Sequence, residues 1–396
     1  MEDVDCRVPG FKAAAAVAGL KKGDALDVGL IVSETEAVAA GVFTTNQVRA
    51  APVILCERHL EKGKARAIIA NAGGANACTG AAGFEDACRT AQLVAETLNI
   101  GSGEVMVAST GVIGQRLNMA RIEKAVPVLA KDLSAEGIPQ VARAIMTTDS
   151  FPKMSRFDGE GGGKSYRIVG IAKGAGMIMP QMATMLCFLL TDIHMERGDL
   201  RRILAASAEA TFNRITVDGD TSTNDTALIL ANGLAGNGPL SAEDMDMFTG
   251  GLRQVMGDLA RMIVQDGEGA TKLVRIEVTH AASPSDARRA ARTVANSSLV
   301  KTAVYGQDPN WGRIMAALGR SGIEMVEEQV DIWVDQVRIV EGGLGKGAEA
   351  EKEASRIMTG KEFGLTIDLH QGSHTDTVLT CDLTHEYVSI NADYRT

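Results

Sequence analysis

The chain has 396 residues, of which 45% are hydrophobic and 23% charged, and its formal net charge is −10. This length exceeds one compact core and predicts two or three domains, and the composition is typical of a folded globular protein. No basic block stands out and aromatic residues make up only 4%, which argues against a nucleic-acid partner. Small molecules are therefore the expected partners.

The cysteines, the histidines and the first residues bear on redox state, metal binding and cellular location. The six cysteines are scattered without a CxxC pair, which is typical of reduced, mostly buried thiols. The start is acidic where a signal peptide would be basic and then apolar, and no apolar run is long enough to cross a bilayer, so we expect a cytoplasmic protein with no membrane partner. His370 and His374 flank a Gln-Gly-Ser turn and no other histidine spacing matches a metal motif, so no metal is expected.

The N-terminal part of the chain is expected to form a layered sheet covered by helices. Brief, β-branched runs bounded by glycine or polar residues predict strands. These strands are 26–33, 37–45, 51–56, 65–74 and 166–176. Apolar residues that recur with a period of 3.6 predict helices at 83–98, 119–146, 200–212 and 243–264. Pro127 should end or kink the second of these helices.

Beyond Thr271 the pattern predicts a smaller mixed α/β unit. Its strands are expected at 273–280, 300–306, 330–341, 363–370 and 377–390. They enclose two predicted helices, Pro284–Ala295 and Gly345–Met358.

Three local motifs suggest ligands but are better explained as turns. Residues 343–348 match GxGxxG/A, yet no second mononucleotide-binding half is evident. Residues 158–165 lack the first glycine of a phosphate loop and precede a strand, which favours a flexible connection. A third cluster could suggest calcium, but an Asx-rich turn is preferred because short Asp and Asn side chains bond their own backbone. Its residues are Asp218, Asp220, Asn224 and Asp225.

Taken by itself, Thr184 is a β-branched residue in an apolar run, and it would be interpreted as a threonine packed in a buried strand. Its surroundings, KGAGMIMPQMATMLCFLLTD, resemble the processing site of the ornithine acetyltransferase (ArgJ) family, in which the bond before the threonine of an ATML segment is cut. Further segments resemble this family, in order, along nearly the whole chain. They are STGVIG, TTD, VDGDTSTNDT, QDGEGATK, DPNWGR and the terminal NADYRT.

The resemblance implies an α/β (α+β) fold with a layered, self-processing, N-terminal-nucleophile-like core, as in the DmpA/ArgJ fold. With the predicted elements, it places a catalytic domain at 1–275 and a smaller α/β domain at 276–396, whose tail returns to the active site. Cleavage between Ala183 and Thr184 would give chains 1–183 and 184–396. The resemblance implies an assembly with two copies of each chain.

Cleavage would supply the base that a threonine hydroxyl needs. A free α-amine ordinarily has a pKa of about 7.7 to 8, close enough to cytoplasmic pH to accept the proton of the Thr184 hydroxyl. The resemblance implies that acetyl moves from N-acetylornithine to the Thr184 oxygen, that ornithine leaves, and that glutamate then takes the acetyl group in the cyclic route to arginine. The resemblance thus implies a glutamate N-acetyltransferase without a cofactor. Whether acetyl-CoA also serves as donor, as in bifunctional members, stays open, with a weak preference for two activities.

The resemblance also assigns site residues. The Thr110 hydroxyl and the Gly111 N–H would hold the oxyanion of each tetrahedral intermediate. Substrate-binding positions carried over are Thr147, Lys173, Thr184, Glu268, Asn391 and Thr396. Lys173 suits a carboxylate and Glu268 an ammonium, both through charge-assisted bonds. If Thr396 reaches the site, the terminal NADYRT must be ordered.

Two other functions are kept as alternatives. The first is a self-processing aminopeptidase or amidase of the related fold, in which water resolves the acyl-enzyme. The second is an uncleaved binding protein that keeps the fold.

The sequence departs from the family pattern at four positions. Met179 and Gln181 stand where the family's usual MIHPNMATML has histidine and asparagine. Ala72 and Gly74 stand where its usual NSGNANACTG has serine and asparagine.

Overall fold

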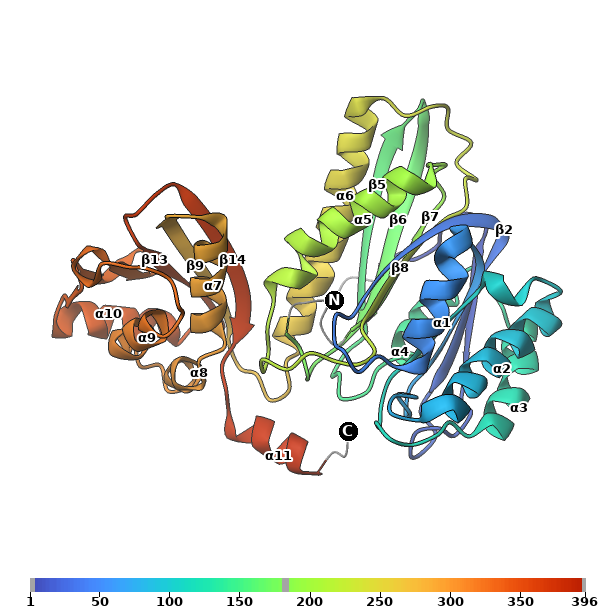
Figure 1. Ribbon diagram of the computed structural model, residues 1–396, viewed down its shortest axis with the longest axis horizontal. Helices are drawn as coiled ribbons and strands as arrows, with labels where there is room; N and C mark the ends of the chain where they lie inside the picture. The colour runs from blue at the N-terminus through green and yellow to red at the C-terminus, as the bar shows by residue number, and fades with distance from the viewer. Residues whose placement is uncertain (1–3, 180–184, 394–396) are drawn as a thin grey trace. The chain divides into compact units, whose positions relative to one another are not determined.

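The computed structural model describes residues 4–179 and 185–393, which fall into two compact units (Figure 1). The first unit comprises the described residues up to Asn213 together with Asp220–Ile263, and the second comprises Arg214–Gly219 and the residues from Val264 onward. Among the described residues, every helix is too short or too polar to cross a lipid bilayer.

The first unit is built on an eight-stranded sheet in the order β4-β3-β2-β8-β7-β6-β5, with β1 paired to β2. The pairs β3/β4 and β7/β8 are parallel and the other pairs are antiparallel. The strands are β1 (Phe11–Ala16), β2 (Val28–Phe43), β3 (Lys64–Asn71), β4 (Val105–Ser109), β5 (Lys153–Gly161), β6 (Lys164–Lys173), β7 (Leu186–Thr191) and β8 (Thr226–Ala231).

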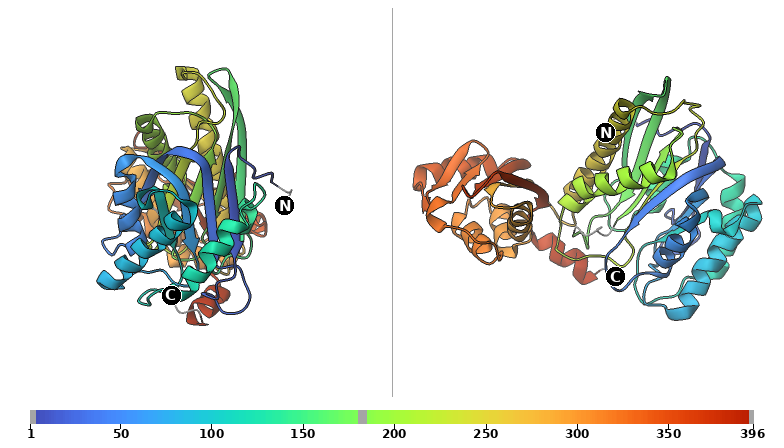
Figure 2. Two further views of the ribbon diagram at one scale, coloured as in Figure 1. Left: turned by 90° about the vertical axis from the view of Figure 1, so that its right-hand side faces the viewer. Right: turned by 45° about the horizontal axis from the view of Figure 1, so that its top comes forward.

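Helices cover this sheet in two groups. They are α1 (Ala51–His59), α2 (Gly80–Leu98), α3 (Met119–Lys131), α4 (Ile138–Ala144), α5 (Arg197–Ala210) and α6 (Ala242–Gln265). The first three lie beside the β2–β4 half, α5 packs against β2, and α6 runs along β5 and β6 (Figure 1 and Figure 2). Helix α4 packs into an apolar core that both halves of the sheet share, because Ile31 and Ile68 of one half and Phe188 of the other belong to it.

The second unit has a six-stranded sheet in the order β12-β11-β10-β13-β9-β14, in which β13 and β9 are parallel. The strands are β9 (Leu273–Ala281), β10 (Asp331–Val334), β11 (Val337–Glu341), β12 (Leu344–Gly345), β13 (Glu362–Asp368) and β14 (His374–Cys381). The helices are α7 (Pro284–Ala295), α8 (Ser298–Tyr305), α9 (Trp311–Gly319), α10 (Ala348–Met358) and α11 (His385–Asp393). Alternate residues of β9, Arg275 and Glu277, face away from the core, so the helices cover one face only.

The expected α/β class with layered sheets is confirmed, but two predicted strands and the last part of a third are wrong. Residues 51–56 lie in α1, 300–306 lie largely in α8, and 385–390 lie in α11. The first two are short apolar runs, for which hydrophobic periodicity alone does not separate a strand from a helix. Pro52 favours the start of α1, because proline fits the first turn of a helix. The Ser297 side chain caps α8 by accepting the Val300 N–H.

Two further expectations need correction. Pro127 does not end its helix, because α3 continues to Lys131 and the break comes at 132–137. The ring lies on the exposed face, where water can solvate the carbonyl that loses its N–H partner. The glycines at 159–163 are not a flexible connection either: β5 runs to Gly161, and Gly162 and Gly163, both at positive φ, turn the chain directly into β6.

Candidate active site

Thr110 and Gly111 directly follow β4, the edge strand of the first unit's sheet. The Thr110 N–H donates to the Asn71 carbonyl at 2.9 Å, and the Thr110 side chain is buried. The Ser109 hydroxyl donates to Asn71 Oδ1 at 2.7 Å, so two bonds tie this turn to the end of β3. The predicted oxyanion residues therefore sit on a fixed support.

Gly111 occupies a position that only glycine fills without displacement. Its φ is +124°, and a Cβ placed there would lie 2.5 Å from the Gly73 carbonyl carbon and 2.7 Å from the Gly74 nitrogen. The segment 73–74 runs this close because Gly74 forms β-bridges with Thr110 and Val112. The close approach of two backbones explains the residue type independently of catalysis.

Lys173, the last residue of β6, is brought to Thr110. The buried Lys173 ammonium donates to Thr110 Oγ1 at 3.3 Å. Asp149 lies beside both, since its carboxylate accepts the Gly174 N–H at 2.7 Å and the Thr147 N–H at 3.0 Å. Thr110, Thr147 and Lys173 are thus neighbours through one buried carboxylate, although they are far apart in the sequence.

Asp149 is charged despite its burial. Burial raises the pKa of this carboxyl, but Lys173 and Lys153 outweigh it and lower the pKa to about 2. Lys153 Nζ donates to Asp149 Oδ1 at 2.7 Å with both side chains fully buried. Lys21 is also close enough to interact with Asp149, and burial lowers the pKa of its ammonium. The ammonium groups of these lysines can attract a carboxylate ligand.

Sequence reasoning did not single out Asp149, Lys153 or Lys21. Asp149 ends the TTD segment, which gave a signal, but the two lysines belong to no motif and meet the site only through the fold. Asn224 and Asp225 were interpreted as an Asx-rich turn. Both are buried, and Asn224 Nδ2 donates to the carbonyls of Ala75 and Ser109 at 2.6 and 2.8 Å, so their side chains bond far beyond their own turn.

Glu268 and Asn391 meet within the second unit. Asn391 Nδ2 on α11 donates to Glu268 Oε2 at 2.7 Å, and Glu268 is buried. Tyr387, one turn earlier, donates its hydroxyl to Asp218 Oδ2 at 3.3 Å. Asp218 and Glu268 thus both hold α11, and the described part of the terminal segment, through Asp393, is helical.

Several predicted residues lie outside the described residues. They are Gln181, Ala183, Thr184 and Thr396. The cleavage site and the nucleophile therefore stay predictions, and the described residue next to them is Met185, which directly precedes β7.

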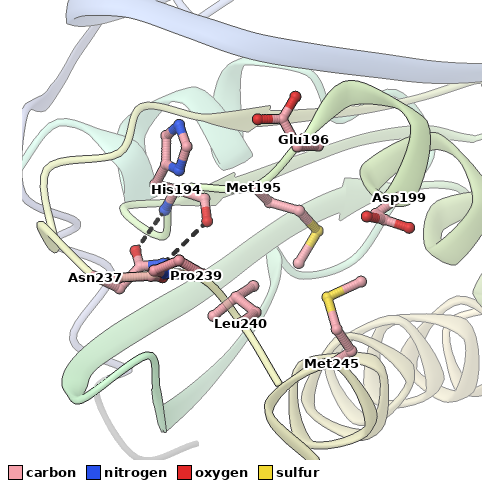
Figure 3. Close-up of a pocket in the computed structure, with 9 residues that line it drawn as sticks. His194, Met195, Glu196, Asp199, Asn237, Pro239, Leu240 and Met245 are labelled. Atoms are coloured by element: carbon pink, nitrogen blue, oxygen red, sulfur yellow. Dashed lines mark hydrogen bonds between the residues drawn. The ribbon is translucent and has the colours of Figure 1, made fainter. Parts of the chain in front are cut away.

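A pocket of about 490 Å³ in the first unit lies elsewhere (Figure 3). The His194 N–H donates to Asn237 Oδ1 at 2.7 Å, and Asn237 Nδ2 donates back to the His194 carbonyl at 3.1 Å, which closes one wall. Its lining residues are His194, Met195, Glu196, Asp199, Asn237, Gly238, Pro239, Leu240 and Met245. No predicted site residue lines it, and we assign it no role.

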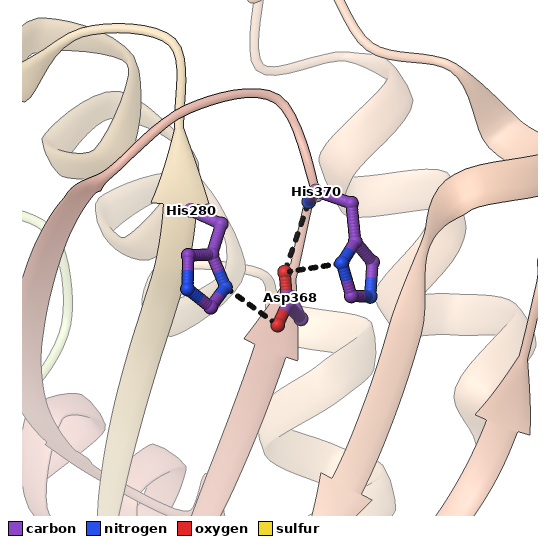
Figure 4. Close-up of side chains that lie close together, drawn as sticks. All are labelled: His280, Asp368 and His370. Carbon is purple, nitrogen blue, oxygen red and sulfur yellow. Dashed lines mark hydrogen bonds and ion pairs between the residues drawn. The ribbon is translucent and has the colours of Figure 1, made fainter.

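His280, Asp368 and His370 form a cluster in the second unit (Figure 4), whereas His374 lies apart on β14. His280 Nδ1 is 2.7 Å from Asp368 Oδ2, and His370 Nε2 is 2.8 Å from Asp331 Oδ2. The potential ligand atoms spread over up to 4.8 Å, against about 3.3 Å between ligands on a tetrahedral zinc. We interpret the cluster as hydrogen bonds that hold the turn after β13.

The glycines at 342–347 form a hairpin and a helix start. They join β11 to the antiparallel β12 and then to α10, so the strand–turn–helix of a dinucleotide site is not formed. A Cβ on Gly343 would lie 2.5 Å from the Glu327 carbonyl oxygen, and one on Gly345 would lie 2.8 Å from the Trp311 ring. Close packing accounts for these two glycines.

Comparison with known proteins gives the family. The sequence model described as the ArgJ family matches residues 12–396. The chain is 50% identical over 391 residues to the arginine biosynthesis bifunctional protein ArgJ of Geobacter sulfurreducens, covering 98% of this chain and 100% of that one. It is 48% identical to the protein of the same name from Syntrophotalea carbinolica, with the same coverage. A crystal structure of the Bacillus halodurans protein of that name is similar with a TM-score of 0.50 and 43% identity, over 52% of this chain and 98% of that one. The chain belongs to the ArgJ family.

Proposed function

We propose that this chain transfers an acetyl group from N2-acetyl-L-ornithine to L-glutamate in arginine biosynthesis, through an acetyl ester on Thr184. Membership of the ArgJ family over nearly the whole chain carries this proposal, since the relatives are named arginine biosynthesis bifunctional proteins. The same name favours a second activity, acetylation of glutamate from acetyl-CoA. Acetyl-CoA then acts as a substrate, and no bound cofactor takes part. We place the enzyme in the cytoplasm.

The first step is self-cleavage between Ala183 and Thr184, which leaves Thr184 at the head of the second fragment. The solved Bacillus halodurans chain supports this step, because 98% of it matches only 52% of this chain, about the length of a 184–396 fragment. The new α-amine then takes the proton of the Thr184 hydroxyl as that oxygen attacks the acetyl carbonyl. We propose that two copies of each fragment assemble.

The buried groups around Thr110 suit the two acyl transfers. Each tetrahedral intermediate places negative charge on the former carbonyl oxygen, which the Thr110 hydroxyl and the Gly111 N–H would bind. Lys173 and Thr147 bind the substrate α-carboxylate, with the charge of Lys173 partly balanced by Asp149. Glu268, held by Asn391, receives the ornithine ammonium, and Thr396 adds a further polar contact.

The test has two parts on one preparation. Denaturing mass spectrometry of the wild type should give fragments 1–183 and 184–396, and Thr184→Ala should give one intact chain. The cleaved enzyme, supplied with acetyl-labelled N-acetylornithine and glutamate, should yield labelled N-acetylglutamate. Label released only as acetate would favour the amidase alternative, and an intact wild-type chain without transfer would remove the proposed function. Acetyl-CoA with glutamate alone tests the second activity.

A further inference from the structure

Asn224 fixes the peptide bond that precedes Thr110. Its side-chain amide, 6% exposed, donates to the Ser109 carbonyl at 2.8 Å. The N–H of the same peptide bond belongs to Thr110 and donates to the Asn71 carbonyl at 2.9 Å. Both polar groups of this peptide are therefore satisfied by neighbouring segments, which limits its rotation.

Asp225 fixes the residue that follows Thr184. Its side chain is fully buried, and Oδ1 accepts the Met185 N–H at 3.0 Å. The next residue, Thr226, donates its N–H to the Met185 carbonyl at 3.0 Å. The Asp225 backbone is itself anchored, because its carbonyl accepts the Thr44 N–H at 3.0 Å. The N–H and the carbonyl of Met185, the residue after the predicted nucleophile, are thus both held by residues 225–226.

The second oxygen of Asp225 distinguishes this residue from an ordinary backbone cap. Oδ2 is buried and has no hydrogen-bond partner among the described residues. Burial raises the pKa of Asp225 well above its usual range, against the opposing effects of the Met185 N–H and Lys173. Lys173 instead bonds Thr110 and interacts with Asp149. The raised pKa favours the neutral acid, which accepts the Met185 N–H without placing a second negative charge beside Lys173.

We propose that Asn224 and Asp225 are positioning residues that set Met185, the residue between Thr184 and β7 in the sequence, against the Thr110 oxyanion donor, with Asn224 holding the peptide before Thr110 and Asp225 holding Met185. The two residues are adjacent, so a single short segment connects the two halves of the catalytic centre. Small errors in that distance are costly, since a misplacement of about 1 Å reduces rates by about a hundredfold. This inference rests on the proposed function.

A matched control exists at the other end of β7. Asp192 follows that strand, is 5% exposed, and its Oδ1 accepts the Arg167 N–H at 2.8 Å. Burial raises the pKa of Asp192 as well. Removing either carboxyl deletes a buried acceptor of a backbone N–H in the same sheet, but only Asp225 borders the predicted nucleophile. Asp192→Ala therefore measures the effect of lost stability alone.

The experiment compares self-cleavage and steady-state kinetics of the full chain in four variants. Asp225→Ala and Asn224→Ala should each slow cleavage and lower kcat by about tenfold or more, with the KM for N-acetylornithine within about twofold. Asp225→Asn should restore most of the lost rate, because its amide oxygen still accepts the Met185 N–H without a charge. Asp192→Ala should lower the melting temperature and leave kcat unchanged.

Two results would overturn the proposal. If Asp225→Asn is as slow as Asp225→Ala, an ionised carboxylate is required and neutral positioning is wrong. If Asp192→Ala slows the enzyme as much as Asp225→Ala, loss of stability explains the effect. Should Asp225→Ala fail to fold, Asn224→Ala tests the same connection from its other end.

A second measurement separates this inference from the proposed function. In the uncleaved Thr184→Ala background, hydrogen–deuterium exchange at the Met185 amide should accelerate in Asp225→Ala and stay slow in Asp225→Asn. Slow exchange in Asp225→Ala would exclude Asp225 as the group that holds Met185. A wild-type chain that neither cleaves nor transfers acetyl would remove the proposed function, while the exchange result would still decide whether Asp225 holds this residue.

Discussion

The Lys173 ammonium donates to the Thr110 hydroxyl at 3.3 Å, and both side chains are buried. A hydroxyl that accepts from an ammonium directs its own proton elsewhere, because an ammonium offers donors only. The Thr110 O–H is therefore available as a donor to a developing oxyanion. The cation beside it also strengthens that donor at a site with little water.

Thr110→Ala should lower kcat by about a hundredfold or more, because one oxyanion donor is lost. Thr110→Ser keeps the hydroxyl and serves as the control, with most of the activity retained. Steady-state assays of acetyl transfer to glutamate measure both. An unchanged kcat in Thr110→Ala would remove this hydroxyl from the mechanism.

Gly111→Ala should impair both folding and turnover, since its Cβ would lie 2.5 Å from the Gly73 carbonyl carbon at a φ of +124°. Gly114→Ala is the matched control in the same turn: its φ is +81°, and a Cβ there meets nothing within 4 Å. The control should cost about 1 kcal/mol of stability from the backbone conformation alone. We expect kcat to fall in the first variant and to hold in the second, and equal rates would contradict a role for the close approach at Gly111.

Asp149 should make stability depend on pH in acid. Its pKa in the folded chain, about 2, lies below the ordinary aspartate value of 3.8. Its contribution is therefore complete above about pH 4 and is lost as the pH falls towards 2, and the shift corresponds to about 2 kcal/mol. The urea midpoint of the wild type should decline over this range. Asp149→Asn should be less stable at pH 7, because Lys153 stays buried without its carboxylate, and should decline less in acid.

Asp158 provides the comparison for that pH experiment. It pairs with Arg156 and Arg167 on the surface, and its side chain is 46% exposed. Asp158→Asn should change stability by less than about 1 kcal/mol, as is usual for exposed ion pairs. A midpoint in Asp149→Asn that follows the wild type at every pH would show that the buried pair does not stabilise the fold.

How much of the fold could be predicted depended on whether local signals agreed. Helix α7 was predicted to the residue, because Ser283 caps its N-terminus and Pro284 opens its first turn. Helix α8 was not, since residues 300–306 are rich in β-branched side chains that are typical of strands. Its Lys301 is buried and donates to Thr380 Oγ1 at 2.9 Å, a long-range bond that no local pattern reveals.

The same limit applies to the site. The predicted residues Thr110, Thr147 and Lys173 do come together, but the group that joins them, Asp149, gave only a weak signal as the end of a short motif. The buried Lys153 belongs to no motif, and its pairing with Asp149 is formed only in the fold. Asn224 was assigned to a turn because the residues that its amide reaches, Ala75 and Ser109, are more than a hundred positions away.

Asn391→Ala should raise the KM for N-acetylornithine by about tenfold and leave self-cleavage unchanged. Asn391 Nδ2 donates to Glu268 Oε2 at 2.7 Å, so its loss frees a buried carboxylate that we assign to the substrate ammonium. The loss of one hydrogen bond to a charged group corresponds to about 1.5–3 kcal/mol, which agrees with a rise in the KM of about tenfold or more. Ser389→Ala is the control on the same helix, because within the described part of the chain its hydroxyl bonds only the His385 carbonyl. Deletion of residues 391–396 should raise the KM at least as much as Asn391→Ala. If the truncated enzyme binds N-acetylornithine as tightly as the wild type, the tail takes no part in the substrate site, and Glu268 would then have to act without it.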